Sequence, residues 1–262
     1  MATGSSKRSK QPSNPKAAAG CLKAQDRSIQ HPNMIRTVIS QVLSRIKRKP
    51  YTLNPVIPTG YLVALCLRNA GMLARGLMTC CHKTGPLYRG AGVKIRCARK
   101  LRTGRNVRID RGSYLDALSE HGIILGNNVS VGQSTTIECS STLSNIGQGL
   151  SVGDRSGLGT HGFYGCVGGI TIGNDVLIGN FVSMHAENHV FSDSRTPIRE
   201  QGLTHEGIRI GNNCWIGAKT TILDGASIGD GTVIAAGSVV LRGEYHSNAV
   251  YGGIPAKLIR MI

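Results

Sequence analysis

The chain has 262 residues, of which 31 are Lys or Arg and 14 are Asp or Glu, and it holds 35 Gly but only one Trp, seven Tyr and three Phe. A hydrophobic content of 40% excludes disorder of the whole chain, and the absence of a Gly-X-Y period excludes collagen. The excess positive charge lies in residues 1–100, while residues 101–262 are close to neutral, and no nucleic-acid-binding motif accompanies the basic residues. This distribution argues against a nucleic-acid-binding protein.

Residues 1–32 are polar, basic and interrupted by proline, a composition that predicts a disordered basic tail. They contain no apolar core of a signal peptide. The eight cysteines form no CxxC pair and no zinc-ligand spacing, so we expect reduced thiols in a cytoplasmic protein.

Residues 33–90 are expected to form an N-terminal helical segment. Apolar residues recur at helical spacing over 34–46 beside basic residues, and a second apolar helix is expected at about 60–80. The second stretch includes Arg68 and is a poor candidate for a membrane-spanning helix. Two interpretations stay open: the helices pack on the main domain or a second subunit, or residues 1–82 contact an anionic membrane surface peripherally.

From about residue 97 the sequence is periodic at six residues, which fits neither a helix nor a long strand. The period fits a short strand followed by a tight corner, so that three hexads make one triangular coil and stacked coils pair edge to edge. We therefore predict an all-β, parallel β-helix of hexapeptide repeats over 91–262 with its aliphatic residues pointing inward. The aliphatic positions are Ile109, Leu115, Leu125, Val131, Ile137, Leu143, Val152, Leu158, Tyr164, Ile172, Ile178, Met184, Val190, Ile210, Ile216, Ile222, Ile228, Ile234 and Val240.

The period breaks after Leu143, after Tyr164 and, most widely, after Val190. The last break leaves room for a loop over 191–207 that departs from one corner of the prism. Because large excursions from a repeat scaffold commonly carry function, we expect the site near this loop.

Four segments of the periodic region resemble hexapeptide-repeat acyltransferases, and most closely the branch of sugar and surface-polysaccharide O-acetyltransferases. The resemblance implies a left-handed β-helix, a homotrimer, acetyl-CoA as the donor, and active sites between neighbouring subunits. The segments are IGNDVLIGNFVSMHAENHVFSD, PIREQG, IRIGNNCWIGAKTTILDGASIGDGTVIAAGSVV and GGIPAKLIRMI.

His189 is the candidate catalytic base. Within the hexads Asn188 takes the small inward position and Val190 the large one, so alternation points His189 outward at the mouth of the loop. An imidazole titrates near neutral pH and can take a proton from a sugar hydroxyl. The resemblance also implies a catalytic histidine in this register.

Other residues near the loop are expected to support His189 or to contact the acceptor. His185 takes a position usually held by Gly, and His161 lies at the break near Tyr164. The loop residue Gln201, in the pattern PI-x-x-QG, favours the polysaccharide branch. The group that orients His189 stays open: a backbone carbonyl is one possibility, and the carboxylates near it are Glu187, Asp193, Glu200 and Glu206.

The resemblance also implies the binding site for the donor. It places Trp215 on the wall of the CoA groove, although a purely packing role is the alternative. It implies that the backbone amides near Ala218 and Ala236 bind the pantetheine arm. The basic residues that it places near the CoA phosphates, with ordinary solvated charges as the alternative, are Arg242, Lys257 and Arg260.

These features favour an enzyme that moves acetyl from acetyl-CoA to a sugar hydroxyl, on a bacterial surface polysaccharide (O-antigen or capsule) or its precursor. The alternative acceptor is the amino group of a nucleotide-linked sugar. A non-catalytic trimeric scaffold and a zinc enzyme of the carbonic-anhydrase type are weaker alternatives, the latter because the spacing of His161, His185 and His189 places them at different hexad phases. We expect no metal site and no nucleic-acid partner, and a cytoplasmic protein at the inner face of the membrane.

Overall fold

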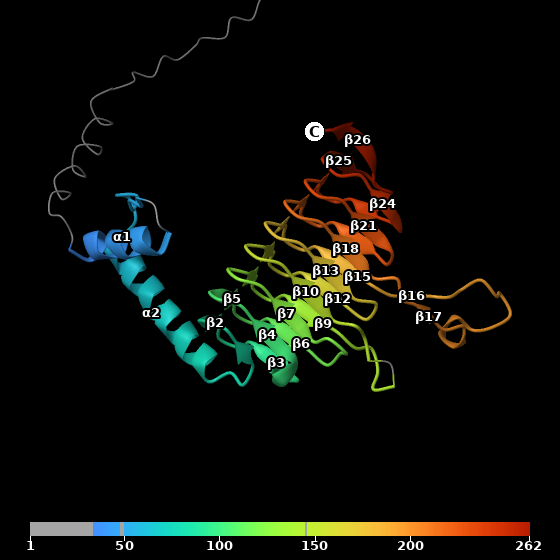
Figure 1. The fold of residues 1–262 in the computed structure, drawn as a ribbon, viewed down its shortest axis with the longest axis horizontal. Coiled ribbons are helices and arrows are strands. Elements are labelled where there is room, and N and C mark those ends of the chain that lie inside the picture. Colours follow the sequence, from blue (N-terminus) through green and yellow to red (C-terminus); the bar gives the residue numbers. More distant parts are fainter. Residues whose placement is uncertain (1–33, 48–49, 145) are drawn as a thin grey trace, which may run out of the picture. The chain divides into compact units, whose positions relative to one another are not determined.

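The computed structural model describes residues 34–47, 50–144 and 146–262 (Figure 1). The chain divides into two compact units, Met1–Leu65 and Cys66–Ile262, and the boundary falls inside the second helix. The expected disordered tail, residues 1–32, lies outside the described residues.

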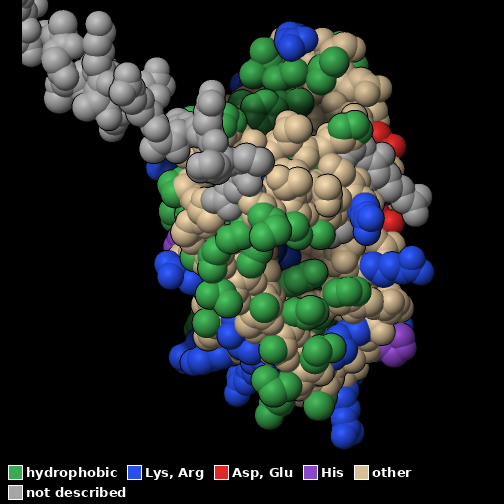
Figure 2. All heavy atoms as spheres, turned by 90° about the vertical axis from the view of Figure 1, so that its left-hand side faces the viewer, with side chains coloured by type: hydrophobic (Ala, Val, Ile, Leu, Met, Phe, Trp, Pro, Cys, Tyr) green, Lys and Arg blue, Asp and Glu red, His purple; other side chains and the backbone are tan. Residues whose placement is uncertain are grey.

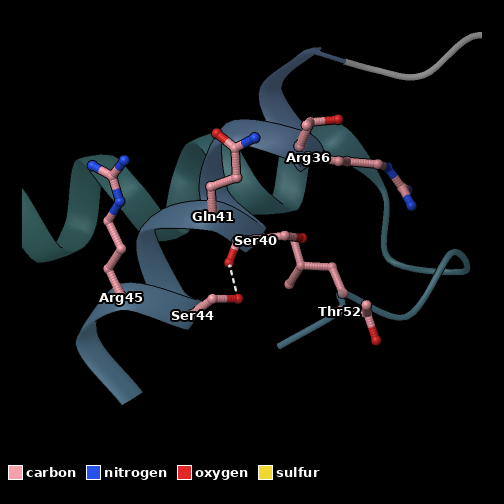
Figure 3. A pocket seen from close by; sticks show the side chains of 8 residues that line it. Arg36, Ser40, Gln41, Ser44, Arg45 and Thr52 are labelled. Carbon is pink, nitrogen blue, oxygen red and sulfur yellow. Dashed lines mark hydrogen bonds between the residues drawn. The ribbon is translucent and has the colours of Figure 1, made fainter. Parts of the chain in front are cut away.

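The first unit contains α1 (Met34–Lys47) and the start of α2 (Thr59–Leu77). The polar face of α1 holds the segment that follows it: the Arg36 guanidinium donates to the carbonyls of Pro55 and Ile57, and the Ser44 hydroxyl accepts a hydrogen bond from the Tyr51 amide at 2.9 Å. A shallow cavity of about 610 Å³ lies on this face (Figure 3). Four apolar side chains of α1 are exposed, those of Met34, Ile35, Val38 and Val42.

The second unit is a left-handed parallel β-helix built from three sheets, each of which takes one strand from every coil. The first sheet consists of β1 (His82–Lys83), β4 (Leu101–Thr103), β7 (Ile123–Leu125), β10 (Leu150–Val152), β13 (Ile170–Ile172), β18 (Ile208–Ile210), β21 (Ala226–Ile228) and β24 (Gly243–Tyr245). The second consists of β2 (Leu87–Arg89), β5 (Val107–Ile109), β8 (Ser130–Val131), β11 (Gly157–Leu158), β14 (Leu177–Ile178), β19 (Trp215–Ile216), β22 (Val233–Ile234), β25 (Ala249–Gly252) and β26 (Lys257–Met261). The third consists of β3 (Lys94–Arg96), β6 (Tyr114–Asp116), β9 (Thr136–Glu138), β12 (Phe163–Gly165), β15 (Ser183–His185), β20 (Thr221–Leu223) and β23 (Val239–Val240).

Three further short elements lie outside these sheets or between their strands. A two-stranded antiparallel ribbon, β16 (Asn188–His189) and β17 (Leu203–Thr204), projects from the prism (Figure 1). Two short 3₁₀ turns are η1 (Ala98–Lys100) and η2 (Ile198–Glu200). Within the three sheets every described pairing is parallel except that β26 folds back antiparallel on β25.

The coils begin before residue 91, the expected start of the β-helix. β1 pairs with β4 and β2 pairs with β5, so the first coil opens at His82. The hexad pattern is hidden there because Arg89 stands in register with the inward Ile109, and Lys83 stands in register with the buried Thr103. Both cations cap the carboxyl end of α2 and the turn after it: Lys83 Nζ donates to the carbonyls of Gly76 and Thr79, and Arg89 donates to the Thr79 hydroxyl.

The inward aliphatic residues form the core in the predicted phase, with two exceptions. Ile222 and Ile228, for example, are fully buried. Leu143 is 86% exposed, and Val190 is only half-buried, because both lie on excursions that leave the prism rather than in its strands. The assignment of Leu143 and Val190 to the core was therefore wrong.

The three edges of the prism differ in their turns, and we name them by the sheets that they join. The first corner joins the first sheet to the second and consists of residues 104–106, 126–128, 153–155, 173–175, 211–213 and 229–231. The second corner joins the second sheet to the third and consists of residues 90–92, 110–112, 132–134, 159–161, 179–181, 217–219 and 235–237. The third corner joins the third sheet to the first and carries both long excursions, residues 139–149 and 186–207.

Candidate active site

His189 lies on the projecting ribbon, opposite Leu203. The chain leaves the prism directly after Ala186, which is fully buried, and returns at Gly207, so the excursion begins earlier than the predicted loop 191–207. The ribbon has its own register, and the two-residue alternation of the prism no longer applies to it. Asn188 is therefore exposed rather than inward, which corrects the prediction for this residue.

The imidazole of His189 is exposed, and it makes no hydrogen bond or ion pair within the part of the chain that the structure describes. Its position is fixed by the backbone instead. The ribbon pairs Asn188 with Thr204 and His189 with Leu203, and the Val190 amide donates to the Gly202 carbonyl at 3.1 Å. The backbone at His189 is thus held in place, while both ring nitrogens have no partner among the described residues.

Gln201 closes the tip of the loop. Its amide nitrogen donates to the carbonyls of Asp193 and Thr196, at 2.7 Å each, and its oxygen accepts from the Asp193 amide at 3.0 Å. The Asp193 carboxylate in turn accepts from the Arg195 amide and the Thr196 hydroxyl, which together lower the pKa of Asp193. These side chains hold the loop's shape.

The base of the loop is anchored by carboxylates. The buried Asp224 accepts hydrogen bonds from the amides of Glu206 and Gly207 at 2.7–3.1 Å. The Glu206 carboxylate lies 3.0 Å from an Arg242 guanidinium nitrogen. Arg242 therefore stands at the third corner beside the loop, and a role with the CoA phosphates stays a prediction for it.

Glu187 is the carboxylate near His189 with an unsatisfied oxygen. Glu200 pairs with Arg199 at 3.5 Å, and Asp193 and Glu206 have the partners given above. Glu187 Oε2 is buried and has no hydrogen-bond partner among the described residues. Because a buried carboxylate oxygen without a donor is costly, this atom is the one poised to accept a hydrogen bond from a ligand, from His189 or from a second copy of the chain.

His185 lies on β15 and is half-buried, with its ring tilted against Phe163 at 5.4 Å between centroids. Burial lowers the pKa of His185 below its ordinary value, and the negative charge of Glu187 offsets part of that shift. The imidazole is therefore held neutral at pH 7, directly below the start of the ribbon.

His161 lies elsewhere, at the second corner. Its ring stacks on that of Phe181 at 5.0 Å, and both residues adopt positive φ angles, 56° and 59°. Ala218 follows in the same column of turns, since the Lys219 amide donates to the Asn180 carbonyl and the Phe181 amide to the Thr160 carbonyl.

The second corner also carries the residues expected to bind the pantetheine arm. The amides of Ala218 and Ala236 have no acceptor within residues 50–144 and 146–262. The backbone is tightly packed at this point: a Cβ at Gly179 would lie 2.6 Å from the Ala218 nitrogen, and one at Gly217 would lie 2.4 Å from the Ala236 nitrogen. The glycines therefore allow the coils to stack closely here, while the amides of Ala218 and Ala236 keep no acceptor among the described residues.

The remaining residues expected near CoA lie on the second sheet. Trp215 is 57% exposed on β19, between the exposed Leu177 and the half-buried Val233 in the neighbouring strands. Lys257 and Arg260 are exposed on β26. Trp215 is thus not a core residue, and its side chain is available on the surface of the sheet.

His189 and the two free amides lie at opposite ends of paired strands. The ribbon starts beyond the end of β15, whereas Ala218 precedes the start of β20, and β15 pairs with β20. Within a single chain, His189 and the amides of Ala218 and Ala236 are therefore separated by the width of the third sheet.

Two further properties of the described residues concern metal binding and membrane insertion. No group of three or more His, Cys, Asp or Glu side chains that could hold a metal ion is found in that part of the chain. None of its helices has the length and hydropathy needed to cross a bilayer.

Comparisons with known proteins identify the repeats. Residues 207–242 match the family described as bacterial transferase hexapeptide (six repeats). The chain is 37% identical over 98 residues to a putative lipopolysaccharide biosynthesis O-acetyl transferase, WbbJ, of Escherichia coli (35% of this chain, 50% of the relative). It is 38% identical over 94 residues to the galactoside O-acetyltransferase of the same species (36% of this chain, 44% of the relative).

The fold also resembles that of solved structures. One is AntD, an N-acyltransferase from Bacillus cereus in complex with dTDP and 3-hydroxybutyryl-CoA, with a TM-score of 0.47, 17% identity and coverage of 72% of this chain and 86% of that one. The chain spans half or less of the length of the two curated relatives. Residues 207–242 thus match the repeats of the bacterial transferase hexapeptide family, and the resemblance drawn from the sequence is confirmed.

Proposed function

We propose that the protein transfers acetyl from acetyl-CoA to a sugar hydroxyl, with His189 as the general base. The observation that carries this proposal is the exposed imidazole of His189, whose backbone is fixed in the ribbon and whose ring has no hydrogen-bond or ion-pair partner among the described residues. The names of the relatives, two of which are O-acetyltransferases, support the reaction class.

The donor site is proposed along the second corner. The free amides of Ala218 and Ala236 are suited to the pantetheine arm and to the oxyanion that forms on the thioester carbonyl, since preorganised donors stabilise developing charge. Trp215 would line the groove. The cations proposed to meet the CoA phosphates are Lys257 and Arg260, with Arg242 of a neighbouring chain.

The proposed active site takes residues from two copies of the chain. Within one chain His189 and the corner amides are separated by the third sheet, so a base and an acyl donor would meet when the ribbon of one subunit reaches the second corner of the next. A homotrimer, with three such interfaces, is the assembly that we propose.

In the proposed step the sugar hydroxyl oxygen attacks the thioester carbonyl carbon while His189 accepts the hydroxyl proton. The carbon–sulfur bond then breaks, the CoA thiolate leaves, and the imidazolium returns the proton to sulfur. Glu187 and the neutral His185 are proposed to orient His189. His161 and Asn188 are proposed to contact the acceptor, and Gln201 is proposed to maintain the conformation of the loop.

We propose a bacterial surface polysaccharide, such as O-antigen or capsule, or its precursor, as the acceptor. The name of one relative favours this choice. A nucleotide-linked amino sugar remains the second candidate, in which the amine takes the place of the hydroxyl.

The N-terminal helices are proposed to hold the enzyme at the inner face of the cytoplasmic membrane. The exposed apolar residues of α1 lie on the same helix as Arg45 and just before the basic residues that follow it, a combination suited to anionic lipid. Figure 2 shows Lys and Arg side chains next to hydrophobic ones at the surface.

Mass spectrometry of candidate glycans after incubation with acetyl-CoA tests the reaction. The expected product is heavier by one acetyl group, and its hydroxylamine sensitivity distinguishes an ester from an amide. Absence of transfer to any glycan, with acetyl-CoA bound, would contradict the proposal.

A further inference from the structure

A second cavity, of about 520 Å³, lies where α2 meets the first turns of the second corner. It is formed within the second unit, and α2 contributes Arg68, Met72 and Arg75 to it. The turns contribute the rest of the lining, which is Gly90, Ala91, Asp110, Arg111, Gln133 and Thr160. We call it the corner pocket.

The corner pocket is strongly cationic. Three guanidinium groups line it, those of Arg68, Arg75 and Arg111, and none of them forms an ion pair among the described residues. The single lining carboxylate, Asp110, lies 3.5 Å from the Arg108 guanidinium outside the pocket, so its charge is already offset. Arg68 makes no hydrogen bond in the described part of the chain.

Two of the guanidinium groups are oriented by neighbours that leave most of their donors unused. Arg75 Nε donates to the Arg89 carbonyl at 3.0 Å, and Arg111 Nε donates to Gln133 Oε1 at 3.0 Å. The terminal nitrogens of both groups have no acceptor within the described residues. Fixed guanidinium forks with free terminal N–H groups are suited to phosphate oxygens.

The polar atoms of the corner itself are also donors. The amides of Ala91, Arg111 and Gln133 have no acceptor among residues 50–144 and 146–262. Since Gln133 Oε1 is engaged by Arg111, the side chain has its NH₂ group left, and the Thr160 hydroxyl is free as well. Free amides on neighbouring coils, next to cations, are suited to the oxygens of an anion.

We propose that the corner pocket binds a phosphate or diphosphate group, namely that of a glycosyl phosphate acceptor. The pocket lies in the same column of turns as His161, Ala218 and Ala236, so an acceptor anchored there would extend along the corner that we assign to the donor. The identification of the ligand as the acceptor rests on the proposed function, whereas the binding of phosphate does not.

Isothermal titration of the full-length chain with inorganic pyrophosphate at low ionic strength tests the pocket. We expect saturable binding, weakened about tenfold or more in Arg68→Gln and in Arg111→Gln, because each removes a charge-assisted hydrogen bond. Arg102→Gln, at an exposed arginine of β4 outside the pocket, is the matched control and is expected to bind as the wild type does. Equal affinity in all four proteins would overturn the proposal.

Arg68 is the safest position for this test because its side chain holds no other part of the chain. Unchanged thermal melting of Arg68→Gln shows that a loss of binding is local. His189→Ala should bind pyrophosphate normally. If transfer is absent but pyrophosphate binding responds to the arginine variants, the proposed function fails and the pocket stands; if transfer occurs but the variants bind pyrophosphate normally, the pocket fails alone.

Two further probes separate the sources of the phosphate. Glucose 1-phosphate is expected to bind, and to bind about tenfold more weakly in Arg68→Gln and Arg111→Gln. Vesicles containing phosphatidylglycerol supply the same chemistry as a lipid headgroup. If the two variants lose vesicle binding while glucose 1-phosphate does not bind the wild type, the acceptor assignment is overturned.

Discussion

The first and second corners have the same turn conformation, but they differ in whether a side chain accepts a hydrogen bond from the backbone amide of the turn. In both, a small residue, usually Gly, is followed by a residue whose amide points along the prism and then by a residue with positive φ. At the first corner the amide finds a side chain in the next coil: Asp154 N donates to Asn174 Oδ1 at 2.7 Å, Asn174 N to Asn212 Oδ1 at 2.9 Å, and Asn212 N to Asp230 Oδ1 at 2.6 Å. At the second corner Ala218 and Ala236 occupy the corresponding positions and supply no oxygen.

This difference separates stability from binding within one repeat. The ladder of Asn and Asp side chains at the first corner saturates the backbone, so that edge has few donors to offer a ligand. The second corner leaves its donors free in the last coils, near the expected donor site, and in the first coils, at the corner pocket. The same turn therefore forms either a hydrogen-bonded edge or a binding groove, depending on whether one residue per coil has a side-chain oxygen.

The largest effect is expected from a residue that belongs to neither corner. His189→Ala should lower the transfer rate by about 10²–10⁴-fold, because loss of a general base costs that much, and should leave stability unchanged because the side chain is exposed. Steady-state kinetics and thermal melting measure both. A variant that keeps more than half of the wild-type rate would refute the assignment of His189.

Ala236→Asn should convert the second corner toward the first. The new side-chain oxygen would accept from the Ala218 amide, as Asn212 Oδ1 accepts from Asn174 N, and would occupy the proposed groove. We expect KM for acetyl-CoA to rise about tenfold, the loss of one donor to the ligand, with no loss of thermal stability. Ala236→Gly keeps the amide free and is the control; equal KM values for all three proteins would show that the donor binds elsewhere.

Asn174→Ala should convert the first corner toward the second. It leaves the Asp154 amide without its acceptor, and we expect the free energy of unfolding to fall by about 1 kcal/mol with transfer unaffected. Chemical denaturation at one fixed protein concentration measures the change. A fall in activity without a fall in stability would contradict the separation of roles.

The smallest effect concerns pH. Because burial lowers the folded-state pKa of His185 below its ordinary value of 6.5, the unfolded chain binds the proton first as pH falls below that value. Stability is therefore full above pH 6.5 and declines below it. His185→Gln should lose about 1 °C less in melting temperature between pH 7 and pH 5 than the wild type. An identical decline in both proteins would show that His185 does not titrate in this way.

The sequence predicted the coils well because inward aliphatics at a fixed period are a direct consequence of the fold. The prediction failed where hydrogen bonds of charged side chains, or backbone pairing outside the prism, determine where a residue lies. Lys83 and Arg89 hide the first coil because Lys83 donates to carbonyls at the end of α2 and Arg89 donates to the Thr79 hydroxyl. Asn188 and Val190 follow the ribbon rather than the prism. The carboxylate partners were not legible from the sequence, because the unsatisfied oxygen of Glu187 becomes visible only when Asp193, Glu200 and Glu206 are seen with their own partners.

The sequence also could not predict which corner has hydrogen-bonded amides and which corner leaves them free. Asn212 and Ala218 each follow a glycine in the hexad pattern, and nothing local says that Asn212 bonds the previous coil. Ala218 has no side chain that could accept such a hydrogen bond, and its own amide has no acceptor among the described residues. Both facts become visible only when the register between neighbouring coils is known. The role of Ala218 in binding CoA stays a prediction of the family resemblance.

The two ends of the stack of coils are closed in different ways. At one end the cations of the first coil hold the carboxyl end of α2, and at the other β26 turns back on β25 in the antiparallel sense. A repeat protein whose coils were open at both ends could add another molecule to each exposed edge and grow into a fibre. The reversed last strand ends parallel pairing in the second sheet at β25. The edge of β25 is therefore occupied, and a second molecule cannot lengthen the second sheet by parallel pairing at this strand.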